Sequence, residues 1–307
     1  MKALLVTHND LDGISPIILL NLSKEKFEYK SIDIADVDRT FDELFESGDI
    51  NKYNQLYVVD LTLTEHVYDL LTKEKRNVLV FDHHESHKFA NKYDFVNVTV
   101  DINGVLTCGT ELFYLYLLKK YPSIYDNNKI KEFVKLVREK DTYVFTSEMP
   151  KELELLQLFY GRNQFIKLFT KRLRSKKEVF NFTTFEKRYL EVIEDDRKRY
   201  IRSKALSMKK YVVKDKKFGI VFADKYKDDV GNELAIKNPD LDGILIINMA
   251  KSISYRTIKS DINLNEFASV YGGGGHQKAA GSFITTKDRE AFLKYYFKDI
   301  KEIKEES

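Results

Sequence analysis

Tryptophan is absent from the 307 residues, and cysteine occurs only once, as Cys108. A single cysteine excludes an internal disulfide framework and is compatible with a reducing compartment. No apolar run approaches the roughly 20 residues of a membrane span. The first residues also lack the long apolar run and the small-residue cleavage site of a signal peptide. These absences predict a cytoplasmic protein without a membrane partner.

A strong charge of either sign is missing too, because 51 Lys and Arg residues are balanced by 48 Asp and Glu residues, which leaves a net charge of +3. No global field favours a nucleic-acid partner, so any basic footprint has to be local. The basic segments at residues 171–177 and 197–204 are typical of solvated helix faces, although they could guide an oligonucleotide backbone. The hydrophobic fraction of 43% indicates a globular protein, long enough for two domains.

Three short runs in the first half are too apolar for half-exposed strands, namely residues 3–8, 56–61 and 78–83. Segments with helical spacing of apolar residues lie between and after them, starting at Ile14, Leu63 and Thr110. A further helical segment ends at Asp141, and more helix is expected over 151–180. Continuous apolar strands that alternate with helices predict an α/β fold with a parallel sheet covered on both faces.

A long charged segment that starts at Phe185 has helical character and few core residues. It predicts a helical linker over residues 185–210. The later runs KFGIVFA, DGILIINMA and SISYRTI predict strands. We therefore expect an N-terminal parallel-sheet domain over 1–184 and a smaller α/β domain over 211–307.

Acidic and imidazole side chains end each of the three apolar runs of the first half. The first run leads into His8, Asp10 and Asp12, the second into Asp60, and the third into Asp82, His83 and His84. Because ligands of an open parallel sheet bind outside the carboxyl ends of its strands, we expect these groups at one edge. Asp141, at the end of a helix, could add a further carboxylate.

Each of these groups has an ordinary interpretation when it is taken alone. An aspartate pair in a loop is usually a turn or a helix cap, and Asp82 with the two histidines after it could form a hydrogen-bonded loop. Taken together, so many anions would repel one another unless cations lay between them. We set His66 and His87 apart from the group, as ordinary surface or partly buried histidines.

The kind of donor indicates the kind of cation. Asp and His ligands without a thiolate suit Mn²⁺ or Mg²⁺, and Mn²⁺ accepts imidazole more readily. Seven or eight donors are too many for one closed site, whereas they suit two metal ions about 3.5–4 Å apart, an arrangement that typically hydrolyses phosphate esters. The strand ends therefore predict a metal-dependent hydrolase.

Four consecutive glycines precede a histidine, in the order Gly272, Gly273, Gly274, Gly275 and His276. Glycine lets backbone N–H groups approach an anion closely, and a helical turn that we expect over 277–280 would favour negative charge in front of it. His276 could donate to a phosphate oxygen or assist the leaving group, and Arg256 could be a second phosphate clamp. A flexible connector is the alternative.

Five motifs follow one another along the chain: HNDLDG (8–13), VVDLT (58–62), FDHH (81–84), REKDT (138–142) and GGGGH (272–276). In this order they resemble the motifs of the DHH phosphoesterase family, of the type with an N-terminal DHH domain and a C-terminal DHHA1 domain. The resemblance covers nearly the whole chain. Within the family, the stretches NPDLDGILIINM and YGGGGHQKAAG are similar to those of the bacterial oligoribonucleases called nanoRNases.

The resemblance implies a pair of Mn²⁺ ions, with Mg²⁺ as the alternative. One ion would be held by His8, Asp10 and Asp60, and the other by Asp12, Asp60, His83 and Asp141. Asp82 and His84 would orient the ligands or touch the substrate. Arg256 would neutralise phosphate charge, and His276 with the glycine backbone of 272–275 would bind the terminal phosphate or nucleotide.

The implied activity is that of a phosphodiesterase or exonuclease that degrades very short RNA, or dinucleotides such as pGpG, to nucleoside monophosphates. The same motifs fit an enzyme that acts on cyclic dinucleotides or on phosphoadenosine phosphate, because the motifs do not set the size of the substrate. An inactive nucleotide-binding sensor is the alternative from another class, although a sensor does not need the full ligand set. The sequence leaves a homodimer open.

Overall fold

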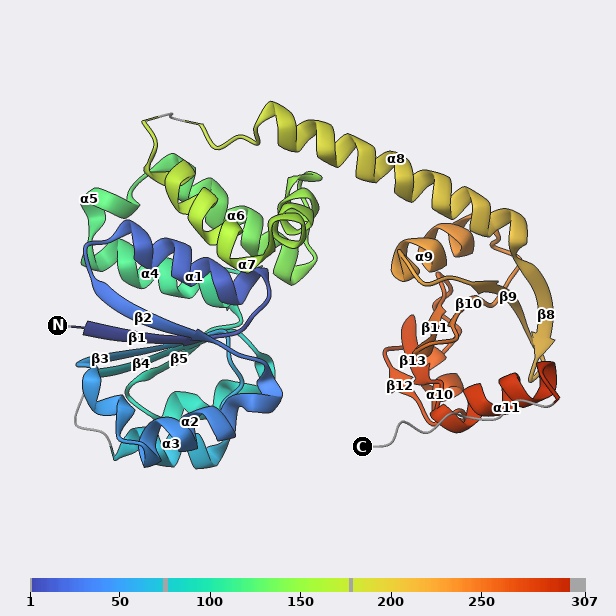
Figure 1. Ribbon diagram of the computed structural model, residues 1–307, viewed down its shortest axis with the longest axis horizontal. Coiled ribbons are helices and arrows are strands. Elements are labelled where there is room, and N and C mark those ends of the chain that lie inside the picture. The colour runs from blue at the N-terminus through green and yellow to red at the C-terminus, as the bar shows by residue number, and fades with distance from the viewer. Residues whose placement is uncertain (1, 74–76, 177–178, 299–307) are drawn as a thin grey trace. The chain divides into compact units, whose positions relative to one another are not determined.

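The computed structural model describes residues 2–73, 77–176 and 179–298. The chain divides into two units, Met1–Leu190 and Glu191–Ser307, each with its own internal contacts (Figure 1).

A five-stranded parallel sheet forms the centre of the first unit, with the strand order β2-β1-β3-β4-β5. The strands are β1 (Lys2–Thr7), β2 (Lys26–Ser31), β3 (Gln55–Val59), β4 (Asn77–Asp82) and β5 (Val96–Val98). Strands β1, β3 and β4 are buried along most of their length, as expected for strands with a helical layer on each face. They are the three strands that the apolar runs predicted, and the parallel sheet is confirmed.

Helices cover both faces of this sheet (Figure 1). One layer holds α1 (Leu11–Leu22), α4 (Gly109–Lys120), α6 (Asn128–Thr142) and α7 (Met149–Arg174), and the other holds α2 (Val37–Glu46), α3 (Glu65–Thr72) and the 3₁₀ helix η3 (Glu85–Lys92). A separate hydrophobic cluster lies under each layer. The first unit is completed by η1 (Ile34–Asp36), η2 (Asp49–Lys52), α5 (Pro122–Tyr125) and the short hairpin of β6 (Asp101–Ile102) and β7 (Val105–Leu106).

Helix α7 is interrupted at Gly161, whose φ of 67° and ψ of 159° are not helical. Positive φ is readily adopted by glycine because it has no Cβ. The second part of α7 packs into the core through Phe165 and Phe169, whose rings stack 4.0 Å apart. Helix α8 (Thr184–Ser207) follows. Near its start the buried Glu186 accepts two hydrogen bonds from Arg172 of α7, at 2.6 and 2.8 Å.

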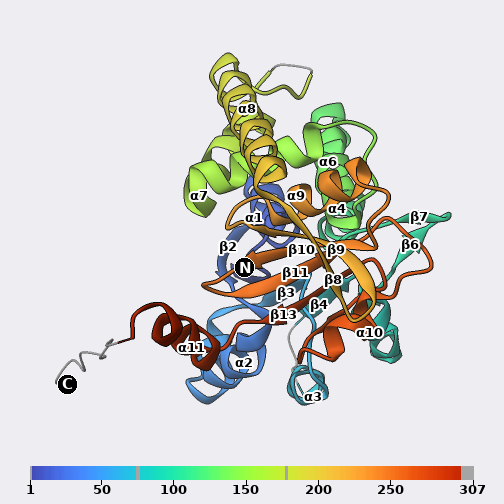
Figure 2. The same cartoon turned by 90° about the vertical axis from the view of Figure 1, so that its right-hand side faces the viewer.

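The second unit contains a six-stranded mixed sheet in the order β12-β13-β11-β10-β9-β8 (Figure 2). Its strands are β8 (Lys209–Val213), β9 (Lys216–Phe222), β10 (Gly243–Asn248), β11 (Ser252–Arg256), β12 (Gly274–Gly275) and β13 (Ala279–Phe283). Only β9 and β10 pair in parallel. Helix α9 (Lys227–Lys237) packs with one hydrophobic cluster and α10 (Leu264–Ser269) with another, and α11 (Thr286–Tyr296) is the last helix of the described residues.

The α/β architecture predicted from the sequence is confirmed, but one local expectation is wrong and one strand was missed. Residues 277–280 form no helical turn: the backbones of His276 and Ala279 bond each other, at 2.7 and 3.2 Å, and close a tight hairpin between β12 and β13. Strand β2 was not expected, because its sequence KFEYKS is largely exposed at the edge of the sheet. Within the described ranges, no helix has the length and apolar character that crossing a bilayer requires.

Candidate metal centre

The carboxyl ends of β1, β3 and β4 bring the predicted acids and histidines to one edge of the sheet. His8 follows β1, Asp60 follows β3, and Asp82 is the last residue of β4. Thr7, the last residue of β1, links this end to α1 and β3, because its hydroxyl donates to the carbonyl of Gly13 at 2.6 Å and of Val59 at 2.9 Å. Since neighbouring parallel strands are in register, the three polar ends lie close together.

Helix α1 contributes two aspartates. Asp10 is its N-cap, and one carboxylate oxygen accepts a hydrogen bond from the backbone of Gly13 at 2.8 Å. Asp12 lies in the first turn and is almost completely buried. Its carboxylate accepts from the backbone N–H groups of Gly109 at 2.7 Å and of Thr110 at 2.9 Å. These groups belong to the first turn of α4, where N–H groups and the helix dipole stabilise a negative charge.

Asp60 lies at the centre of the site, in a left-handed backbone conformation with φ of 55°. Burial raises the pKa of this carboxyl well above its usual range, and the negative charges of Asp12 and Asp10 raise it further. Gly109 leaves the space that this arrangement needs, because a Cβ at that position would lie 2.7 Å from the Asp60 Cβ.

The ligand atoms form overlapping groups whose members lie within 4.8 Å of one another. In the first group, the His8 Nδ1 lies 3.1 Å from the Asp10 Oδ2 and 3.8 Å from the Asp60 Oδ2. In the second, which joins Asp12, His83 and Asp141, the His83 Nε2 lies 3.4 Å from the Asp141 Oδ2. The same nitrogen also lies 3.4 Å from the Asp60 Oδ1. Asp12 lies slightly farther from the same nitrogen, at 4.0 Å. A third group joins Asp60, Asp82, His83 and His84.

Three polar atoms in these groups are buried without a hydrogen-bond partner among the described residues: the Asp60 Oδ2, the His83 Nε2 and the Asp141 Oδ2. Unpaired polar atoms are costly to bury. Burial also lowers the pKa of His83, which favours the neutral imidazole that a metal ligand requires. The residues therefore fit a divalent cation, and these Asp and His clusters could hold metal ions.

Asp141 comes from the last turn of α6. Burial raises its pKa to about 8, and the negative charges of Asp12 and Asp10 contribute to the rise. The side chain is thus protonated over much of the neutral range when no cation is bound. His8 differs, because a hydrogen bond with Asp10 raises the pKa of its imidazole.

Asp82 does not share the pattern of Asp60. Burial opposes its ionisation, but hydrogen bonds from His84 and His87 outweigh it and lower the pKa of the carboxyl. The bonds measure 2.7 Å to the His84 Nδ1 and 2.6 Å to the His87 Nδ1, and the backbone N–H of His83 adds a third at 2.8 Å. Asp82 therefore fixes the orientation of the His84 and His87 imidazoles and holds the backbone at His83.

His87 is the residue that the sequence analysis placed wrongly. We set it apart as an ordinary histidine, whereas it is buried and bonded to Asp82. The 3₁₀ helix η3 returns the chain toward β4, which the polar sequence after His84 did not indicate. His66 does lie apart, on the exposed surface of α3, where it contacts Asp42 at 2.7 Å.

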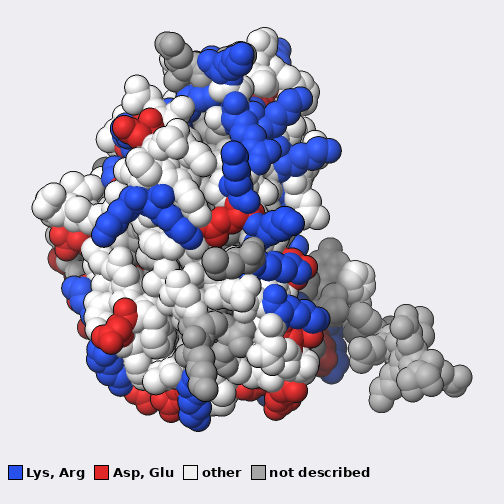
Figure 3. Space-filling view, turned by 90° about the vertical axis from the view of Figure 1, so that its left-hand side faces the viewer, with Lys and Arg blue, Asp and Glu red and all other residues white. Residues whose placement is uncertain are grey.

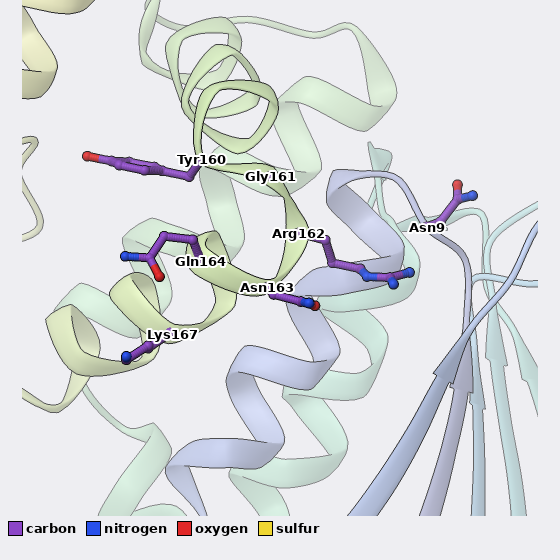
Figure 4. A pocket seen from close by; sticks show the side chains of 7 residues that line it. All are labelled: Asn9, Tyr160, Gly161, Arg162, Asn163, Gln164 and Lys167. Atoms are coloured by element: carbon purple, nitrogen blue, oxygen red, sulfur yellow. The ribbon is translucent and has the colours of Figure 1, made fainter.

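Two hollows adjoin the site. A small one of about 180 Å³ is lined by Asp10, Leu11, Asp12, Val137, Lys140, Asp141, Tyr143 and Glu154. A larger, open one of about 770 Å³ is lined by Asn9, Tyr160, Gly161, Arg162, Asn163, Gln164 and Lys167. Figure 4 shows Arg162 extending toward Asn9, the residue between His8 and Asp10. The larger hollow thus begins beside the metal groups and ends among polar and basic side chains.

The predicted substrate-binding residues lie near one another in the second unit. Arg256 pairs in register with Ala279 across β11 and β13, and the backbone of Ala279 bonds His276 in the hairpin turn. The His276 side chain is exposed. Arg256 is not free, because it donates to the carboxylate of Asp228 and, at 2.7 Å, to the carbonyl of Tyr255.

The glycine run is part of the sheet rather than a loose connector. Gly272 and Gly275 have positive φ angles of 68° and 144°. At Gly273, a Cβ would lie 2.1 Å from the carbonyl oxygen of Gly281. Gly274 and Gly275 form β12 and pair with β13. Three of the glycines therefore suit the backbone of this hairpin, whatever they bind: Gly272 and Gly275 through their positive φ, and Gly273 through the close carbonyl. At Gly274 a Cβ would meet nothing closer than 3.5 Å.

Lys and Arg side chains gather in a band in the upper half of the face that Figure 3 shows. The two basic segments are largely exposed, as expected for solvated helix faces, but three of their arginines also have structural partners. Arg172 bonds Glu186, and Arg174 donates to the carbonyl of Asn21. Arg197 contacts the carboxylates of Glu194 at 2.8 Å, Asp229 at 3.3 Å and Glu233 at 3.2 Å. Lys177 lies outside the described residues.

The raised pKa of Asp141 makes a prediction for the metal-free protein. The Asp141 carboxyl holds its proton more tightly in the folded state than in the unfolded state. The free energy of unfolding of the protein therefore falls as the pH rises from about 4 toward the folded pKa of about 8. Asp141→Asn removes this loss. In the presence of a chelator, urea unfolding should show the variant more stable than the original chain by about 1–3 kcal/mol near pH 8, with little difference near pH 4.

Asp69→Asn is the control, because Asp69 is an exposed carboxylate of α3, outside the metal groups. It should leave the pH dependence of unfolding unchanged. Equal stabilities of the Asp141→Asn variant and the original chain at both pH values would contradict the buried, repelled carboxyl described above.

Comparison with family models gives no match. The chain is 33% identical over 308 residues to oligoribonuclease NrnB of Bacillus subtilis (strain 168), in an alignment that covers 96% of this chain and 76% of the relative.

Two solved structures share the fold. The pGpG-specific phosphodiesterase PggH of Vibrio cholerae has a TM-score of 0.54 at 14% identity, over 96% of this chain and 97% of that one. Exonuclease RecJ bound to manganese has a TM-score of 0.51 at 12% identity, over 98% and 91%. Identity at the level of the NrnB alignment, over nearly the whole chain, confirms what the motifs predicted: the chain belongs to the DHH phosphoesterase family of metal-dependent hydrolases.

Proposed function

We propose that the chain is a Mn²⁺-dependent phosphodiesterase that degrades very short oligoribonucleotides and dinucleotides such as pGpG to nucleoside monophosphates. The observation that carries the proposal is the convergence of carboxylates and imidazoles at the strand ends, with three buried atoms that lack a partner. The oligoribonuclease activity of NrnB supports the substrate class, as does the pGpG-specific PggH with the same fold.

Two ions fit the site better than one. His8, Asp10 and Asp60 would hold one ion, and Asp12, Asp60, His83 and Asp141 would hold the other. Asp60 suits a bridging role, because its Oδ2 faces His8 while its Oδ1 faces His83. Oxygen and imidazole donors favour Mn²⁺, with Mg²⁺ as the alternative. The bound manganese of RecJ agrees with this choice. Cys108 is close by but stays a thiol, because burial raises its pKa.

Metal ions in such a site act as Lewis acids on the phosphoryl oxygens and lower the pKa of water. The chain itself orients the groups around them. The ionised Asp82 accepts a hydrogen bond from the His84 Nδ1, so the neutral ring of His84 carries its proton there and presents its Nε2 away from Asp82. The His84 side chain is 42% exposed. It is placed to contact the substrate, and the hydrogen bond to Asp82 also raises the pKa of its imidazole.

The substrate needs room and cations in addition to the metals. The hollow of about 770 Å³ has the size of a small-molecule site, and Arg162 and Lys167 supply cationic side chains to its lining. In the second unit, we propose that His276 and Arg256 contact phosphate. Arg256 is bonded to an Asp228 side chain that is 75% exposed. A phosphate can displace such a surface partner, because exposed ion pairs contribute little free energy.

The space beside Asp60 allows a test of metal binding in which no proposed ligand residue is substituted. In Gly109→Ala, the new Cβ would lie 2.7 Å from the Asp60 Cβ and 3.1 Å from the Asp12 Oδ2. We expect Mn²⁺ affinity to fall by roughly 10–100-fold in calorimetric titration, as when groups that orient metal ligands are changed. Gly274→Ala is the control, because its nearest atom would be 3.5 Å away, and it should bind Mn²⁺ normally.

A substrate panel with Mn²⁺ tests the activity. It contains pApA, pGpG, a cyclic dinucleotide, phosphoadenosine phosphate and a longer RNA. We expect the linear dinucleotides to be turned over fastest. Asp82→Ala and Asp141→Ala should lower kcat by at least about 100-fold, because each removes a group on which the arrangement of the site depends. The exposed Asp126→Ala should have no effect.

The outcomes separate the alternatives. Fastest turnover of the cyclic dinucleotide or of phosphoadenosine phosphate would replace the substrate but keep the chemistry. Binding of nucleotides without turnover of any of them would favour the inactive sensor. Wild-type rates in both aspartate variants would contradict the site itself.

His276 is predicted to act on binding more than on chemistry. His276→Ala should raise KM for pApA by about 10-fold, the effect of about one lost charge-assisted hydrogen bond, with a smaller change in kcat. Lys278→Ala, in the same exposed hairpin turn, is the matched control. An unchanged KM would remove His276 from the substrate contacts.

A further inference from the structure

Tyr143 is an exposed aromatic residue beside the metal groups that the proposed chemistry does not use. It follows Asp141 by two residues and ends α6 in a left-handed conformation, with φ of 57° and ψ of 27°. Its side chain remains 74% exposed. Helices usually end in this conformation with glycine or asparagine, because a side chain with a Cβ is strained there. A tyrosine at this position therefore has no advantage as a helix cap.

The segment around Tyr143 is held firmly. The buried Glu139 accepts a hydrogen bond from the Thr146 backbone at 3.0 Å and another from its hydroxyl at 2.7 Å. These bonds close the turn that contains Tyr143. An exposed ring on a fixed turn loses little conformational freedom when a ligand packs against it.

The ring is supported on some sides and open on others. The Lys140 Nζ lies over it, 4.6 Å from the ring centre, and is itself paired with Glu154 at 2.8 Å. The ring of Phe145 meets it at 6.0 Å and an angle of 70°. Tyr143 also lines the hollow of about 180 Å³ together with Asp10, Asp12 and Asp141. An aromatic surface thus stands at the edge of the metal groups with much of its area in solvent.

Single exposed aromatics are common on protein surfaces and usually have no role. Three observations set Tyr143 apart from that case: the left-handed backbone, the fixed turn, and the shared lining of the hollow with the metal groups. The ligand is indicated by the chemistry. Carboxylates beside the ring repel a free anion, whereas a flat, uncharged ring stacks well on tyrosine.

We propose that Tyr143 is the platform on which a nucleobase of the substrate stacks, next to the phosphodiester that the metal groups address. The inference rests on the proposed function for the identity of the ligand. Stacking on an aromatic side chain tolerates every base, because each base has a π face. Tyr143 would therefore favour oligonucleotides over other phosphodiesters without selecting a sequence.

The absence of tryptophan gives a direct test of stacking. In Tyr143→Trp, the introduced indole is the sole tryptophan of the chain, and a stacked base should quench its fluorescence. We titrate it in Mg²⁺ with pApA that carries a phosphorothioate linkage and expect saturable quenching. Leu206→Trp is the control, since Leu206 is 88% exposed in α8, and it should show no saturable change. Absence of quenching in Tyr143→Trp, while calorimetry shows that the ligand binds, overturns the proposal.

Kinetics give a second test. Tyr143→Ala should raise KM for pApA by about 5–100-fold, the range that corresponds to the loss of one stacked base, while Tyr143→Phe retains the original KM. With a dinucleotide that has one base replaced by an abasic ribose, at the end that stacks, Tyr143→Ala and the original chain should have equal KM. Val144→Ala changes the exposed neighbour and should have no effect.

The two tests separate this inference from the function on which it rests. If the original chain hydrolyses pApA but Tyr143→Ala has an unchanged KM, the platform is refuted and the function stands. If the original chain hydrolyses no dinucleotide, the function is refuted, and the fluorescence titration of Tyr143→Trp decides by itself whether a base stacks there: saturable quenching supports the platform, and its absence refutes it.

Discussion

Repulsion among closely spaced carboxylates is the constraint on which the site depends. Asp10, Asp12, Asp60 and Asp141 lie close enough that burial and mutual repulsion raise the pKa of two of them, Asp60 and Asp141. Backbone N–H groups hold two of them, Asp10 and Asp12, in place. Asp12 is the clearest case, since its carboxylate is bound by two N–H groups of α4. The positions of these carboxylates are thus set by the end of β3 and by helices α1, α4 and α6.

Asp82, at the same edge of the sheet, has a lowered pKa, unlike Asp60 and Asp141. This carboxylate is completely buried, yet hydrogen bonds from the backbone and from two imidazoles keep it ionised. It is a fixed negative charge, whereas Asp60 and Asp141 can exchange a proton for a cation. The site therefore combines a permanent anchor, which sets the directions of the histidines, with carboxyl groups whose charge depends on what they bind.

The sequence was sufficient for the parts of the molecule that local patterns determine. Strands β1, β3 and β4 are continuous apolar runs, and the polar residues at their ends had to meet if the sheet was parallel. It was insufficient where long-range contacts decide. Strand β2 has a polar, exposed sequence and gains its place by pairing with β1. The hydrogen bond between His87 and Asp82 depends on the path of η3. The bond between Arg256 and Asp228 joins two residues that are 28 positions apart in the sequence.

The backbone at Asp60 limits what evolution can do with this position. A positive φ is accessible to aspartate and asparagine, but hardly to β-branched or bulky residues. If a descendant of this protein abandoned hydrolysis, asparagine and glycine would be the replacements that most readily keep the positive φ with which the chain leaves β3. A relative with Asn at this position and the same strands would keep the backbone conformation of Asp60 but lack its carboxylate.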